Sequence, residues 1–135
     1  MNNTLIVNEL ERLETSIKQS LITATTEFEG ADVIICSTPT DSQKKWAGDQ
    51  NIVIGLQNTS PQKRLVVTKY SQELSGLFFE LQKIFDGRHD FISKYDFYGL
   101  LAQSALDYLN SCKGNENLNE LLLAVLSQAK KFMNE

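Results

Sequence analysis

Apolar residues recur every three or four positions through residues 4–28, and this period constrains the fold more than any other feature of the sequence. Such spacing predicts one long amphipathic helix. The repeat is eleven residues long rather than seven, so the apolar stripe suits a nearly straight helix that lies along a sheet or other helices. The apolar positions are Ile6, Leu10, Leu13, Ile17, Leu21, Ala24 and Phe28.

Three short runs rich in β-branched residues follow this helix, at 32–38, 51–57 and 64–70. Runs of this length and composition predict strands. Turn-forming residues fill the connection between the second and third runs, so we expect those two strands to pair antiparallel. The polar segment 39–50 between the first and second runs is predicted to be a loop.

The second half of the chain has helical periods over 71–86 and 94–112, and a last one that begins after Asn117. The order is therefore one helix, three strands and three helices, and such segregated order is typical of α+β proteins. We expect a single α+β domain over residues 1–135, in which helices cover one face of a three-stranded antiparallel sheet.

Charge and composition exclude several classes of protein. The net charge is −4, which argues weakly against a nucleic-acid binder and suits a basic partner. The longest apolar run falls short of the ~20 residues that cross a bilayer, and the first residues lack the pattern of a signal peptide. We therefore expect a cytoplasmic protein, with Cys36 and Cys112 as reduced thiols. The sequence has no metal-binding or cofactor motif, so neither a metal nor a cofactor is predicted.

One polar cluster could carry chemistry: Asp86, Arg88, His89 and Asp90, which lie together in the connection between two predicted helices. His89 is the only histidine, and it could act as a base or ligand oriented by a neighbouring carboxylate. The alternative is a solvated connector, because turn residues are polar for local reasons.

A second candidate is Lys44-Lys45-Trp46, in the segment predicted to be a loop. Tryptophan beside basic residues suits a protein-interface hot spot or stacking on a base. Residues 39–70 also carry five basic against two acidic side chains, so this is the basic part of an acidic protein. The alternative is that Trp46 folds back over the sheet edge.

The first predicted helix carries Glu9, Glu11 and Glu14, which could steer a basic partner. A solvated helix face explains these acids equally well. Aromatic residues crowd the second half, and some lie off the apolar stripes, which predicts an exposed apolar surface and self-association. These residues are Phe78, Phe79, Phe85, Phe91, Tyr95, Phe97 and Tyr98.

Small acidic domains without catalytic motifs are often inhibitors, so we expect stoichiometric binding rather than catalysis. The predicted function is that of an inhibitor or immunity protein that occludes a basic partner, such as a toxin enzyme. Two alternatives remain: a small-ligand binder or enzyme that uses residues 86–90, and a nucleic-acid-binding module that uses residues 44–46.

Overall fold

The computed structural model describes residues 4–30, 32–50, 63–85 and 97–133. Within these residues the chain forms five helices and one three-stranded sheet, so the α+β class is confirmed. In chain order the elements are α1 (Thr4–Lys18), β1 (Phe28–Glu29), β2 (Val33–Cys36), α2 (Asp41–Gln50), β3 (Arg64–Val67), α3 (Ser71–Phe85), α5 (Phe97–Ser111) and α6 (Leu118–Met133).

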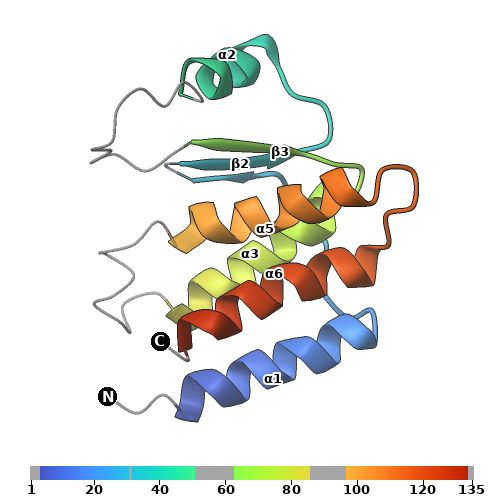
Figure 1. Ribbon diagram of the computed structural model, residues 1–135. Coiled ribbons are helices and arrows are strands. Elements are labelled where there is room, and N and C mark those ends of the chain that lie inside the picture. The colour runs from blue at the N-terminus through green and yellow to red at the C-terminus, as the bar shows by residue number, and fades with distance from the viewer. Residues whose placement is uncertain (1–3, 31, 51–62, 86–96, 134–135) are drawn as a thin grey trace.

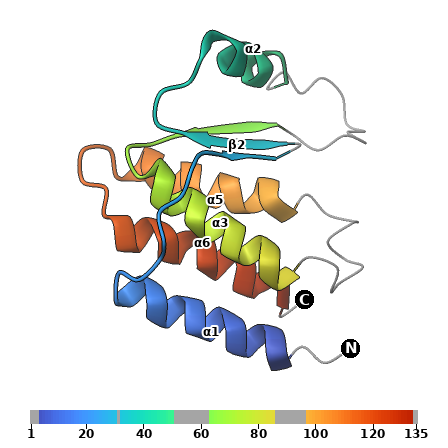
Figure 2. The same ribbon diagram turned by 180° about the vertical axis from the view of Figure 1, so that it is seen from behind.

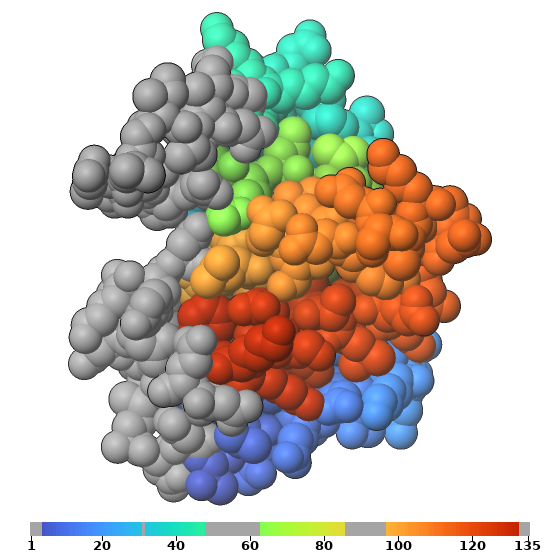
Figure 3. All heavy atoms as spheres, viewed as in Figure 1, coloured from blue at the N-terminus to red at the C-terminus, as the bar shows by residue number. Residues whose placement is uncertain are grey.

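The described elements stack in layers (Figure 1). Helix α2 lies on one face of the sheet, and α3 and α5 cover the other. Helix α6 packs on α5, and α1 packs on α6 and α3. Helices α6 and α1 therefore lie further from the sheet than α3 and α5. The space-filling view shows the same order, from α2 across the sheet to α1 (Figure 3).

The sheet is mixed, and the prediction of a purely antiparallel sheet is wrong. Its strand order is β1-β2-β3. Strand β1 pairs antiparallel with β2, whereas β2 and β3 run parallel, with Ile35 opposite Val66. A parallel pair needs a crossover connection, and α2 lies in that crossover. The predicted strand at 51–57 lies outside the described residues, and β1 was not expected.

Residues 41–50 form a helix, and the prediction of a loop over this segment is wrong. Thr40 and Gln43 make a reciprocal capping box: the Gln43 amide donates to Thr40 Oγ1 at 3.1 Å, and the Thr40 amide donates to Gln43 Oε1 at 2.8 Å. This arrangement satisfies amides that the first turn of a helix otherwise leaves without acceptors. The local signal was therefore present, although the segment has a weak apolar face.

Helix α1 ends at Lys18, ten residues before the predicted end at residue 28. Ser20 adopts a positive φ of 57°, which breaks the helical conformation. The apolar period continues through Leu21, yet that side chain is 63% exposed. Figure 2 shows the segment between α1 and β1 passing α3 on its way to the sheet.

The predicted helices of the second half are confirmed within one or two residues wherever the structure describes them. The last helix begins after Asn117, as predicted, and Asn117 caps it, because the Glu120 amide donates to Asn117 Oδ1 at 3.1 Å. Helix α5 buries Phe97 and Leu101 as well as Ala102 and Ala105. It buries this wider face because the sheet lies on one side of it and α6 on another.

One buried core runs from the sheet through α3 and α5 to α6 and α1. Phe97 is at its centre, with ring centroids 4.7 Å from Phe85 and 4.8 Å from Phe132. Phe97 lies off the apolar stripe predicted for its helix, and it is buried. Phe79, the other off-stripe aromatic, and Tyr98 pack against Phe28, at 5.1 and 6.5 Å. These two aromatics are half-buried parts of the core, and they do not form the exposed apolar face that the self-association prediction needs.

Candidate functional site

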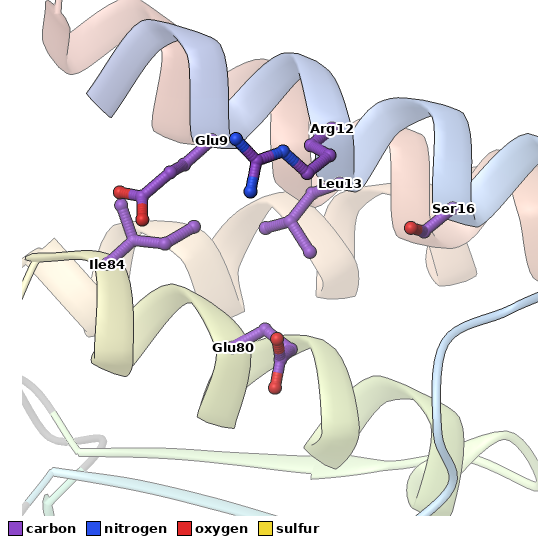
Figure 4. Close-up of a pocket in the computed structure, with 6 residues that line it drawn as sticks. All are labelled: Glu9, Arg12, Leu13, Ser16, Glu80 and Ile84. Atoms are coloured by element: carbon purple, nitrogen blue, oxygen red, sulfur yellow. The ribbon is translucent and has the colours of Figure 1, made fainter. Parts of the chain in front are cut away.

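The candidate site is a hollow between α1 and α3 (Figure 4). It encloses about 170 Å³. Two carboxylates and a guanidinium lie on its rim, and two aliphatic side chains form its floor. The residues that line it are Glu9, Arg12, Leu13, Ser16, Glu80 and Ile84.

Helical spacing explains how α1 supplies both the floor and the rim. Leu13 belongs to the buried stripe of α1, so it points toward α3. Glu9 lies three residues before Arg12, and Ser16 lies four residues after it. Residues three and four apart are neighbours on a helix surface, so these side chains follow the same flank of α1. In Figure 4, Arg12 extends its guanidinium toward Glu9, whose carboxylate lies over Ile84.

A second hollow lies on the other side of Glu80. It encloses about 390 Å³ and is lined by Thr23, Thr25, Gly76, Phe79, Glu80 and Lys83. Because both hollows share Glu80, we treat them together as one surface and call it the α3 groove. The groove therefore combines apolar side chains with charges of both signs, which is the composition of a protein-docking surface more than of a closed ligand pocket.

Glu80 remains accessible in this groove although it has an ion pair. Its Oε2 lies 3.0 Å from Lys83 Nζ, three residues further along the same helix. Both side chains are exposed, Lys83 by 75% and Glu80 by 44%. Exposed pairs of this kind contribute about 0 to 1 kcal/mol, so an incoming cation can displace Lys83 at little cost.

The acids predicted on the first helix do not form one face. Glu9 lines the α3 groove, whereas Glu14 lies toward α6 and pairs with Lys130 Nζ and, at 3.1 Å, with Lys18 Nζ. Glu11 is exposed beside Glu14. Hydrogen bonds from Lys130 and Lys18 lower the pKa of Glu14 below its ordinary value. Glu14 thus links α1 to α6 through its ion pair with Lys130.

Protonation of Glu14 is expected to weaken this link between α1 and α6. Because the pKa is lowered in the folded state, the stabilisation is complete above the ordinary value of 4.5 and is lost as pH falls through the lower folded-state pKa. For a partly exposed pair we expect about 0.5 kcal/mol. Urea unfolding of the wild type and of Glu14→Gln should therefore differ at neutral pH and converge in acid. A difference that persists unchanged in acid would contradict this role.

Lys44, Lys45 and Trp46 lie on α2. Both lysines are exposed, and Trp46 is half-buried. Lys63 Nζ lies 5.2 Å from the centroid of the Trp46 ring. A nucleic-acid base that stacked on the face of the Trp46 ring next to Lys63 would have to displace Lys63. This face of the ring is therefore not open for stacking.

Arg64 is separated from this basic group by the sheet. It is only 9% exposed, and its Nε donates to Gln103 Oε1 of α5 at 3.3 Å. Successive side chains of a strand point to opposite faces, so Arg64 faces α5 while Lys63 faces α2. The contiguous basic face that a nucleic-acid module needs is therefore not completed by Arg64.

The predicted polar cluster of Asp86, Arg88, His89 and Asp90 lies outside the described residues, and its role stays a prediction. In the part of the chain that the structure describes, no group of three or more His, Cys, Asp or Glu side chains could hold a metal ion. No helix in that part is both long and apolar enough to span a membrane. Both cysteines are free thiols, and burial raises the pKa of Cys36.

Of the residues that line the first hollow, Glu9 was predicted from the sequence, whereas Arg12, Ser16 and Glu80 were not. Glu80 flanks the apolar stripe of α3, and such a position carries no local signal of function. Its proximity to Glu9 depends on the packing of α1 against α3. No family model, no curated protein and no solved structure matches this chain.

Proposed function

We propose that this protein acts by stoichiometric binding, and that it docks a partner protein in the α3 groove. The observation that carries the proposal is the pairing of an apolar floor, Leu13 and Ile84, with a carboxylate rim, Glu9 and Glu80. A lysine or arginine side chain fits such a site, because its aliphatic stem can lie on the floor while its charge reaches the rim.

The proposed partner is therefore a protein that presents a basic side chain. Arg12 lies on the same rim and is exposed, so it can pair with a carboxylate next to that basic residue. The negative net charge of the chain would speed the encounter with a basic partner. In this proposal the protein is a cytoplasmic inhibitor of the immunity-protein kind, and it occludes a basic surface without catalysing a reaction.

The proposal is tested with a blocked peptide of alternating lysine and alanine, titrated against ¹⁵N-labelled protein. We expect the amide shifts to concentrate at residues 9–16 and 76–84. Removal of one carboxylate, in Glu9→Gln or Glu80→Gln, should weaken binding by about threefold to fivefold, which corresponds to the ~1 kcal/mol of an exposed ion pair. Lys83→Gln should strengthen binding, since it removes the internal competitor for Glu80.

Glu11→Gln is the matched control, because it removes the same charge from an exposed position of the same helix outside the groove. The control should bind the peptide like the wild type. Equal losses of affinity in Glu9→Gln, Glu80→Gln and Glu11→Gln would mean that only net charge matters, and the groove would not be the docking site. Shifts centred on α2 would instead favour a surface around Trp46.

A further inference from the structure

A separate crevice lies where β3 leads into α3 and α5 ends. It encloses about 370 Å³ and is lined by Val67, Thr68, Lys69, Tyr70, Leu109, Asn110, Lys113 and Glu116. Strands β2 and β3 are parallel and both end here. The crevice beyond the carboxyl ends of parallel strands is where open α/β sheets bind ligands. Figure 3 shows the green atoms that follow β3 beside the orange atoms at the end of α5.

The polar groups that line this crevice are mainly hydrogen-bond donors. Lys69 and Lys113 are exposed, and neither forms an ion pair with a described carboxylate. Lys69 Nζ lies 5.2 Å from the Tyr70 ring centroid, so a neutral ring is its neighbour. Asn110 adds an exposed amide from the last turn of α5.

Thr68 contributes a buried hydroxyl to the same wall. The residue is 7% exposed, and its Oγ1 accepts the Tyr70 amide at 3.1 Å. Within the described residues, the Thr68 hydroxyl does not donate a hydrogen bond. A hydroxyl can accept and donate at once, so Thr68 can still donate to an oxygen that enters the crevice.

The electrostatic sign of the crevice is set by the two lysines. Helix α3 begins at Ser71 and brings a partial positive charge, whereas α5 ends at Ser111 and brings a partial negative one. These two helix ends oppose each other. Glu116 is the one carboxylate in the lining, and its Oε2 already accepts the Gly114 amide at 3.1 Å.

We propose that this crevice binds a small organic phosphate, with the phosphate held by Lys69, Lys113 and the Thr68 hydroxyl. Lysine is a common phosphate ligand in proteins, and it acts on the phosphate as a point charge. Val67, Tyr70 and Leu109 provide apolar surface for the rest of the ligand. The volume is at the small end of ligand pockets, which suits a phosphate monoester of sugar or mononucleotide size.

The test uses the full chain and four probes: inorganic phosphate, ribose 5-phosphate, adenosine 5′-monophosphate and adenosine. Amide shifts of ¹⁵N-labelled protein give the location and the affinity. We expect the esters to shift residues 67–70 and 109–113, to bind more tightly than inorganic phosphate, and to lose affinity as salt rises. Lys69→Gln and Lys113→Gln should each weaken ester binding about tenfold or more, as expected for a lost charge-assisted hydrogen bond.

Lys131→Gln is the matched control, because Lys131 is an exposed lysine near the far end of α6. It should leave the affinity for the esters unchanged. The proposal is overturned if no ester shifts these residues, if adenosine binds as well as its monophosphate, or if the control loses as much affinity as the crevice variants. Equal affinity for inorganic phosphate and for the esters would overturn the assignment of an organic ligand. These outcomes are independent of the α3 groove, which shares no residue with the crevice.

Discussion

Replacing Phe97 with alanine is expected to lower the free energy of unfolding by about 4 kcal/mol. The Phe97 side chain is 2% exposed, and its ring meets Phe85 of α3, Tyr98 of α5 and Phe132 of α6 at centroid distances of 4.7 to 4.9 Å. Truncation therefore loses apolar burial and leaves a cavity where three helices meet. Few neighbours can move to fill it, because each is fixed in its own helix.

Urea unfolding followed by circular dichroism measures this loss. Leu100→Ala is the control on the same helix, since Leu100 is exposed and its truncation should cost less than about 1 kcal/mol. If Phe97→Ala lost no more stability than Leu100→Ala, the side chain of Phe97 would not join α3, α5 and α6. Phe97→Leu should recover part of the stability, because it keeps most of the apolar volume.

Gly76→Ala is expected to destabilise the protein by about 2 kcal/mol, although alanine favours helices over glycine. A Cβ atom at this position would lie 2.0 Å from the backbone oxygen of Thr23. The segment after α1 crosses α3 here, and the Thr25 amide donates to the Gln72 carbonyl at 3.1 Å. The Cβ is held rigidly by the helix and the atom it meets is a backbone oxygen, so neither can rotate away and the segment must move away from the helix.

The control compares alanine with glycine at Gln82, an exposed position of the same helix. There alanine should be the more stable residue by about 1 kcal/mol, so the sign of the difference reverses between the two sites. If Gly76→Ala were also stabilising, the close crossing of residues 21–27 over α3 would be wrong. Because Gly76 and Thr23 line the α3 groove, the variant should also weaken binding of the lysine peptide.

Helices α3, α5 and α6 could be predicted from the sequence because their determinants are local. Apolar spacing, and for α6 the Asn117 cap, act within a few residues of each other. Helix α2 also has a local determinant, the capping box between Thr40 and Gln43, but the polar composition of the segment led to the prediction of a loop. The α+β class followed from the order of these segments.

The parallel pairing of β2 with β3 was decided by tertiary structure. A strand's apolar pattern does not specify its partner or direction, and the pairing depends on the crossover through α2. The end of α1 was decided in the same way. The apolar period continues to Phe28, but that ring packs against Phe78 and Phe79 from a strand rather than from the helix.

The candidate sites depend even more on tertiary packing. Glu9 was found because it stands in an acidic helix, yet only the packing of α1 on α3 brings it near Glu80, 71 residues later in the sequence. Packing of α1 on α6 likewise places Glu14 beside Lys130 and removes it from the acidic surface. The sequence shows directly which residues are charged. Which charged side chains become neighbours depends on how the helices pack, and that packing is driven by the burial of apolar faces that are far apart in the chain.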